Sequence, residues 1–500
     1  MSLKTSSEKY TGRKKIKIDV SYEDFTSNPV KYLEKYLSNV VSEHNTIVTE
    51  IDYLTKYYKG IQDIIEKIRA DGSDINNISI MNYANEIVEF KKGFVVGKPI
   101  KYVNTEDETT EDMKYLNKYL KDVKKKSKDL NKYENLYIFG IAHTFITPKK
   151  KKYDSEKKSP FDYVVLDSRK TFVVYSNDPA CTPLFSVYVS NINDEESKQL
   201  KEVYTIYFDY HSIVVTFDLN ELRILRNIKL EPVENPITEY EKSQSRMGAF
   251  EPVLNSLDTC NYIRSNQLDD IEQFISAFLI FLNQDPKHII ANIEDFKKNR
   301  IFALKTNNPQ APADVKLLQT TLNHSDINEI FNDTKQDIFN ICGVPMATSS
   351  TGQGVSGEAQ TYGGGWENAQ AMATIETTYI TQFEQIDLEK MIDICQNGEN
   401  SKLKNIDANE IDIKYTINKS NNILTKMQAF KYWVDMGGIW ERGLEITDLS
   451  DDSHTVGEES EKNLEKIENR KMELEVKKTK LLSEINNSDE NQNQQEWFIT

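Results

Sequence analysis

The sequence predicts an α+β fold in which helical segments lie on both sides of a region of short strands. Three observations lead to this class. Apolar residues recur every three or four positions between residues 22 and 99, the period of an amphipathic helix. Residues 135–239 contain short β-branched and aromatic runs separated by turn residues, and the helical period returns beyond residue 249. At 500 residues, the chain is long enough for two to four domains.

Composition narrows the classes of function. The chain has 62 basic and 79 acidic residues, a formal charge of −17, which argues against a general positive surface for nucleic acid. Its four cysteines form no C-x-x-C pair, so neither a zinc site nor a disulfide framework is indicated. The first residues lack the apolar core of a signal peptide, and the longest apolar run, "FLIFL" at 278–282, is too short to cross a bilayer. We expect a soluble protein that no cleaved signal exports.

The N-terminal part is predicted to be helical after a polar arm. Two helices are expected between residues 22 and 65, and a third before Gly97 and Pro99. Residues 101–132 are helical in pattern and lysine-rich, with six lysines among residues 121–132. Because no aromatic residues alternate with these lysines, we interpret them as a solvated helix face rather than a nucleic-acid site.

The middle of the chain is predicted to be a mainly antiparallel β region. It starts with "LYIFGIAHTFIT" at residue 136 and ends near Glu239. One hairpin tip carries six lysines between residues 149 and 158, which we interpret as a solvated turn whose charges protect the sheet edge.

Two long helices are expected after the β region. Apolar residues at helical spacing predict one helix over 250–283 and a partner over 325–342 that ends at Gly343. Between them, 284–322 contains the strand-like runs "RIFALK" and "VKLLQ". The pattern indicates a stalk with a small tip. The side chains expected in the core of the helix pair are Phe274, Phe278, Ile338 and Ile341.

A glycine cluster follows the second long helix. Seven of the 19 glycines fall between residues 343 and 365, and three of them, Gly352, Gly354 and Gly357, have the G-x-G-x-x-G spacing of a dinucleotide-binding loop. That motif needs a buried strand before the first glycine, whereas here a helix and the polar "ATSST" precede it. We therefore expect a flexible, nearly neutral loop, and a disordered connector is the alternative.

Other catalytic motifs are missing from the sequence. It contains no H-E-x-x-H pair, no G-x-S-x-G elbow and no calcium loop. We predict no catalytic residues, no metal site and no cofactor.

Several segments taken together resemble portal proteins of long-tailed bacteriophages that infect Gram-positive bacteria. The segments occur in the family's order over roughly residues 30–400, and the chain departs from the pattern where it inserts "TYGGGW" and again beyond about residue 405. They are "YLTKYYKG", "IVEFKKGFVVGKPIKY", "IFGIAHTFI", "LDSRKTFVVYSND", the block from "NPITEY" through "MGAFEPVLNSLDTCNYIRSNQLDDIEQFISAFLIF", and "IFNICGVPMAT" with "VSGEAQTY".

The resemblance implies a portal fold with a mixed α/β wing, a long-helix stem, a small β-containing clip and a helical crown. It divides the chain into an N-terminal arm (1–25), the wing (26–249), a stem helix (250–283), the clip (284–322), a second stem helix (323–343), a tunnel loop (344–365), a wing helix (366–404), the crown (405–487) and a disordered tail (488–500). It makes Gly352, Gly354, Gly357, Gly363, Gly364 and Gly365 the mobile residues of the tunnel loop. The clip residues expected to contact partners are Lys297, Lys298, Arg300 and Lys305.

The resemblance also implies a function. Such proteins form a ring, typically a dodecamer, at one vertex of the virion capsid. Double-stranded DNA is packaged through the ring by the terminase large subunit and is ejected through it. The implied partners are terminase, the head-to-tail adaptor, the major capsid protein and scaffolding proteins, with assembly in the host cytoplasm and no membrane.

The charge pattern agrees with a channel through which DNA slides. Residues 249–283 contain five acidic residues against Arg264, and 323–342 contain four against Lys335. A channel should not bind DNA firmly, because each neutralised phosphate strengthens binding. Ordinary surface charge is an equal alternative. Two other functions stay open: a virion or tail-assembly protein without a channel, and a nucleotide-binding enzyme that uses Gly352, Gly354 and Gly357.

Overall fold

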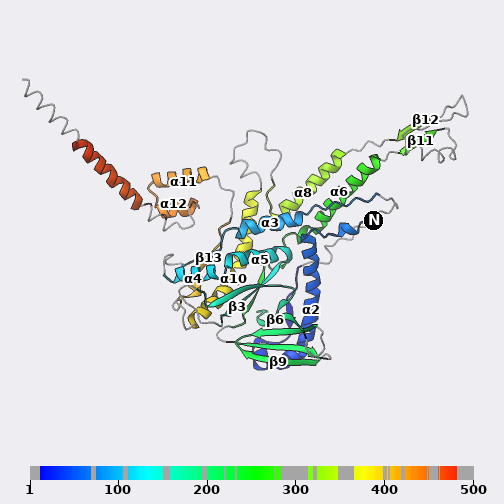
Figure 1. Ribbon diagram of the computed structural model, residues 1–500, viewed down its shortest axis with the longest axis horizontal. Helices are drawn as coiled ribbons and strands as arrows, with labels where there is room; N and C mark the ends of the chain where they lie inside the picture. The colour runs from blue at the N-terminus through cyan, green and yellow to red at the C-terminus, as the bar shows by residue number, and fades with distance from the viewer. Residues whose placement is uncertain are drawn as a thin grey trace, which may run out of the picture. The chain divides into compact units, whose positions relative to one another are not determined.

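The computed structural model describes most of the chain and divides it into two compact units (Figure 1). The first unit reaches Asn418, and the second runs from Lys419 to Thr500. The residues described are 12–68, 75–104, 111–149, 158–193, 200–218, 221–230, 234–275, 278–282, 314–318, 324–346, 365–397, 403, 406–417, 423–447, 449, 456, 460 and 462–480.

The expected N-terminal helices are present. Helix α1 (Tyr22–Ser27) begins after Ser21, whose hydroxyl accepts a hydrogen bond from the backbone N–H of Asp24 at 3.1 Å. Helix α2 (Pro29–Tyr58) has proline at its first position, where no backbone donor is needed. Its buried residues recur every three or four positions from Leu33 to Tyr57. Helix α3 (Tyr83–Val96) follows.

Helices α4 (Glu111–Asp122) and α5 (Lys125–Phe139) contain the lysine-rich segment, and the prediction that its lysines form a solvated face is wrong for two of them. Lys125 and Lys132 are buried, and their ammonium groups donate to Glu384 of the long helix α10 (Trp366–Asn397). Lys125 also bonds Asp129 at 2.9 Å. Burial by itself would raise the pKa of Glu384, but the two lysines lower it to about 2. The two lysines can be buried because Glu384 of the distant helix α10 and Asp129 of α5 itself neutralise them.

The β region is mainly antiparallel, as predicted. A six-stranded sheet has the order β1-β5-β6-β7-β8-β9, in which only β1 and β5 are parallel, and a three-stranded antiparallel sheet has the order β10-β3-β4. The strands are β1 (Ile16–Ile18), β3 (Ile141–Pro148), β4 (Phe161–Leu166), β5 (Thr171–Ser176), β6 (Pro183–Asn193), β7 (Leu200–Phe208), β8 (His211–Asp218), β9 (Glu221–Lys229) and β10 (Ile237–Glu241). The run "LYIF" at 136–139 forms the last turn of α5 and not a strand. The helix ends there because Gly140, at φ 81°, caps it, and strand β3 begins directly afterwards.

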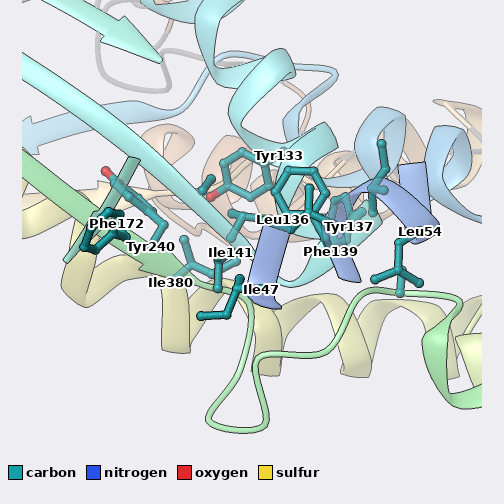
Figure 2. Packing of buried hydrophobic residues seen from close by; sticks show 14 of the residues in the cluster. Ile47, Leu54, Tyr133, Leu136, Tyr137, Phe139, Ile141, Phe172, Tyr240 and Ile380 are labelled. Atoms are coloured by element: carbon teal, nitrogen blue, oxygen red, sulfur yellow. The ribbon is translucent and has the colours of Figure 1, made fainter. Parts of the chain in front are cut away.

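The main core lies where α2, α5 and α10 meet the sheets. Figure 2 shows Ile47 and Leu54 of α2 and Tyr133, Leu136 and Tyr137 of α5 in this core. The last four residues of α5, 136–139, are all buried. They therefore form a continuous apolar run, which in the sequence resembles a buried strand.

The expected 250–283 helix is shorter in the structure. A 3₁₀ turn (Glu251–Val253) leads into α6 (Leu254–Ile275), and Phe278–Leu282 form strand β11, which pairs antiparallel with β12 (Asp314–Leu318). The run "FLIFL" therefore finds a β partner in the predicted "VKLLQ" strand. The strand predicted at "RIFALK" and the hairpin tip at 150–157 lie outside the described residues.

Helix α8 (His324–Cys342) returns beside α6, and α10 follows the glycine cluster. Strand β13 (Ile411–Lys414) pairs with β2 (Lys101–Asn104), so residues 406–417 belong to the first unit and not to a crown that starts at 405. The second unit contains α11 (Ile423–Asp435), α12 (Trp440–Thr447) and a helix over 462–480 whose residues are all exposed. Residues 481–500, which include the predicted tail, are not described.

Candidate functional site

The candidate site is the pair of helices α6 and α8 together with the base of the glycine-rich segment. The two helices run side by side (Figure 1). Gln267 of α6 donates from Nε2 to Oδ1 of Asn328 on α8 at 3.1 Å. Ile338 of α8 is fully buried, whereas Ile341 is 54% exposed. Ile341 therefore does not belong to the core of the chain, because it lies on the solvent side of α8.

Helix α6 is held along one side by a segment from the N-terminal part. Its residues Asn261, Ser265 and Asp269 recur every four positions and so share one face. They accept hydrogen bonds from the backbone N–H groups of Met81 at 2.7 Å, Ser79 at 2.9 Å and Asn77 at 2.5 Å, respectively. This spacing of small polar residues was visible in the sequence, but the segment that they bind was not. The three residues therefore fix the segment 77–81 to α6 and do not form a channel surface.

Most carboxylates in and just before α6 form ion pairs or accept hydrogen bonds from other parts of the chain. Asp269 forms an ion pair of 2.7 Å with Lys67, and Asp258 accepts from the hydroxyl of Tyr57 at 2.8 Å. Glu251 is buried, pairs with the guanidinium of Arg13, and accepts from the N–H of Gly248 at 2.8 Å. Burial would raise the pKa of Asp269, but the bonds from Lys67 and Asn77 lower it. The acidic bias of 249–283 therefore reflects internal bonding in large part.

Helix α8 differs, because its carboxylates are exposed. Asp326, Glu329, Asp333 and Asp337 are separated by three, four and four positions, which puts them on one face. We call these four residues the acidic face. The only lysine or arginine of the helix, Lys335, points away from this face: its Nζ lies 5.0 Å from the ring centroid of Tyr83. Lys335 therefore does not neutralise the exposed carboxylates of Glu329, Asp333 and Asp337.

The glycine-rich segment leaves the end of α8 through a fixed turn. Gly343 has φ 66°, and a side chain there would collide with the sulfur of Met372. The Sγ of Cys342 donates to the carbonyl oxygen of Ala249 at 3.5 Å. Burial raises the pKa of Cys342 to about 12, so its thiol stays protonated and is not a nucleophile.

The chain re-enters the core close to where it left. Gly365 has φ 80°, and a methyl group on it would lie 3.8 Å from the Cα of Pro345. Trp366 then packs on Phe90 and Phe94, each with ring centroids 6.0 Å from those of the indole. Asn368 also donates to the carbonyl oxygen of Asn340 at 3.4 Å. The two ends of the segment 347–364 therefore share one anchored base.

Several predicted site residues cannot be assigned contacts. Gly352, Gly354, Gly357, Gly363 and Gly364 lie outside the described residues, as do Lys297, Lys298, Arg300 and Lys305. Phe274 lies in the last turn of α6 and Phe278 begins β11, so the two do not share one helix face as expected. The helix ends between them because the apolar run that follows forms a strand.

Within the described ranges, no group of three or more histidine, cysteine, aspartate or glutamate side chains is arranged to hold a metal ion. No helix among these residues has both the length and the apolar character needed to cross a bilayer.

Comparison with known proteins supplies a family. Residues 37–472 match the family model described as "Phage portal protein, SPP1 Gp6-like". A comparison with curated proteins gives no match.

Proposed function

Because the chain belongs to the SPP1 Gp6-like phage portal family, we propose that it forms a ring at one capsid vertex, through which double-stranded DNA passes. The match over residues 37–472 is the observation that carries this proposal. The protein is a phage portal protein and hence a component of the virion capsid. The family implies a ring oligomer that associates with the capsid and with terminase.

The finer roles follow from this assignment. DNA enters through the ring during packaging by the terminase large subunit and leaves through it at infection. The clip, which includes Lys297, Lys298, Arg300 and Lys305, contacts terminase and later the head-to-tail adaptor. The ring is a dodecamer with no enzymatic activity of its own, assembled in the host cytoplasm beside the major capsid and scaffolding proteins.

We assign the segment 344–365 to a loop that moves against the DNA. Its two ends share one anchored base, so the segment can change conformation without displacing α8 or α10. Its glycines provide freedom of φ, and its single charge, Glu358, avoids strong contact with phosphate. The acidic face of α8 supports the same role, because exposed carboxylates repel a polyanion.

The nucleotide-binding alternative has less support. A dinucleotide loop follows a buried strand, whereas residues 324–342 before this segment are helical and 343–346 form a turn. A virion or tail-assembly protein without a channel is the second alternative, and imaging distinguishes it.

Electron microscopy of the purified protein tests the ring. We expect rings with a central hole in negative stain. Compact particles that bind labelled NAD or ATP would support the enzyme instead, and oligomers without a hole would support the other structural protein.

A packaging assay tests the loop. Replacing Gly363 and Gly364 by alanine should leave ring assembly intact and shorten the packaged DNA, because alanine restricts positive-φ states. Gly93→Ala is the matched control, since Gly93 lies in α3 with no atom within 4 Å of an added methyl group. Packaging at the wild-type level by the glycine variant would mean that the segment is only a connector.

A further inference from the structure

A pocket of about 570 Å³ opens on the first unit where the N-terminal strand meets the turn after β10. Five cationic side chains line it: Arg13, Lys14, Lys15, Lys17 and Arg246, with Tyr379 of α10 at one side. We call it the basic pocket. Its volume suits a few side chains or a small molecule.

Two of these cations are buried. The side chains of Arg13 and Arg246 are nearly inaccessible, with residue exposures of 1% and 4%. Arg246 donates from Nη1 to Glu239 and Glu241, each at 3.0 Å, and from Nη2 to Glu239 at 2.9 Å. Arg13 donates from Nη2 to Glu251, and its Nε lies 3.4 Å from a carboxylate oxygen of Glu50.

Each arginine keeps an N–H group without an acceptor. In the part of the chain that the structure describes, Nη1 of Arg13 and Nε of Arg246 are buried and make no hydrogen bond. A buried donor that loses water without gaining an acceptor is unfavourable, and such groups are uncommon in folded proteins.

The pocket is built rigidly. The backbone N–H of Arg13 donates to the carbonyl oxygen of Arg246 at 3.2 Å, and Arg246 itself has φ 54°, a conformation that side-chain-bearing residues seldom adopt. Gly12 lies so close to the carbonyl oxygen of Ser245 that no larger residue fits. The chain therefore presents the two guanidinium groups at a fixed position.

The charge of the cluster is nearly balanced. Four carboxylates pair with the buried arginines and with Lys15, namely Glu50, Glu239, Glu241 and Glu251. Five cations against four carboxylates leave one excess positive charge. Lys14 and Lys17 are exposed at the rim, so this excess faces the entrance.

We propose that the basic pocket binds one carboxylate side chain from a second copy of this chain. The volume admits a side chain but not a DNA duplex, and the excess charge matches a single carboxylate. A chain of charge −17 has many carboxylates to offer, and the acidic face of α8 shows that some of them are exposed. In a ring, each copy presents two different surfaces to its neighbours, so a basic site can meet an acidic one.

The inference rests on the ring of the proposed function, and cross-linking of assembled rings tests it. Rings are formed from equal parts of unlabelled and ¹⁵N-labelled protein and treated with a carbodiimide, which joins a lysine to a carboxylate only where the two touch. We expect mixed-isotope peptides that link Lys14, Lys15 or Lys17 to an aspartate or glutamate. Rings whose other lysines cross-link between copies while these three do not would overturn the inference and leave the ring itself intact.

A charge variant gives a second readout. Lys14→Gln with Lys17→Gln should raise the protein concentration needed for half-assembly about tenfold at low salt, with an unchanged unfolding midpoint. Lys31→Gln with Lys35→Gln is the matched control, because both lysines are exposed on α2 away from the pocket. Equal behaviour of the two variants would contradict the proposal.

A third experiment distinguishes a protein carboxylate from a DNA phosphate as the anion that the basic pocket binds. Lysine acetylation is measured in rings with and without duplex DNA, and we expect no protection of Lys14 or Lys17 by DNA. Protection would assign the pocket to phosphate and overturn the proposal. A wild-type protein that forms no ring under any condition would remove both this inference and the proposed function.

Discussion

Helices α6 and α8 pack against each other, and the segments that contain them are both rich in carboxylates. On the α6 side, Glu251, Asp258 and Asp269 bond Arg13, Tyr57 and Lys67, which all lie in the first 70 residues. On α8, Glu329, Asp333 and Asp337 are exposed. The first set joins distant parts of the chain, and the second set remains available to whatever passes or binds α8.

The difference shows what determines the role of a carboxylate. A buried carboxylate is stable only where a donor is fixed opposite it. On the α6 side, Gly12, Asn77 and Tyr57 donate to Glu251, Asp269 and Asp258 from positions 239, 192 and 201 residues away. On α8, by contrast, Glu329, Asp333 and Asp337 are exposed to solvent. Substitutions that remove charge at matched positions should therefore have unequal effects on the two helices.

The largest effect is expected at Glu251. Glu251→Gln removes the buried carboxylate that pairs with the guanidinium of Arg13, leaving only the more exposed Glu50 as its charge partner, and should lower the free energy of unfolding by about 3 kcal/mol. Glu329→Gln on α8 is the matched control and should change it by less than about 0.5 kcal/mol. Urea unfolding of the two variants measures both values. Comparable losses would mean that α8 also bonds its carboxylates internally.

The next effect concerns the apolar side chains of α8. Ile338→Ala should cost about 3 kcal/mol, because the fully buried side chain leaves a cavity. Ile341→Ala, three positions later, should cost less than about 0.5 kcal/mol, because Ile341 is 54% exposed. Thermal unfolding of the unassembled chain compares the two. If Ile341→Ala instead weakens ring assembly alone, the exposed face of α8 is covered by another copy.

A smaller and pH-dependent effect is expected at Asp269. Asp269→Asn removes the charge partner of Lys67 and should cost about 2 kcal/mol at pH 7. Because the pKa of Asp269 is lowered in the folded state, its contribution is present above the ordinary aspartate pKa of about 3.9 and is lost as the pH falls toward the lower, folded value. The difference between wild type and variant should therefore shrink below about pH 4. Asp333→Asn should show no such trend, and a constant difference for Asp269→Asn across this pH range would contradict the assignment.

Much of the fold could be predicted from the sequence. The helical period identified α2, α3, α8 and α10, and the β-branched runs identified most strands of the two larger sheets. The errors have a common physical cause. Lys125, Lys132 and the "LYIF" run are buried residues of α5, and Glu384, which pairs with both lysines, is far away in the sequence, so local patterns misrepresent them.

The site was harder to predict than the fold. The anchored ends of the glycine-rich segment depend on Met372, Trp366 and Asn368 of α10, which no local pattern connects with Gly343. Likewise, the sequence shows the charge of Asp269 and Asp333 but not that Asp269 is buried against Asn77 and Lys67 whereas Asp333 is exposed. Pairing between remote segments is decided by tertiary packing.

The smallest expected effect is a rise in the free energy of unfolding, where the earlier substitutions lower it. Glu329, Asp333 and Asp337 form two like-charged pairs four positions apart on an exposed helix face, and each such pair destabilises a helix by about 0.2–0.5 kcal/mol. Neutralising the three as Glu329→Gln, Asp333→Asn and Asp337→Asn should thus raise the free energy of unfolding by roughly 0.5 kcal/mol at low salt, and the gain should vanish at about 1 M salt as the charges are screened. Asp326 is left unchanged because it lies in the first turn of α8, where the helix dipole favours a negative charge.

The same variant should bind duplex DNA more tightly than wild type in rings at low salt, since three repelling charges per copy are removed. Fluorescence anisotropy with labelled DNA measures this. Unchanged binding, with the expected small gain in stability, would mean that the acidic face of α8 does not line the path of the DNA.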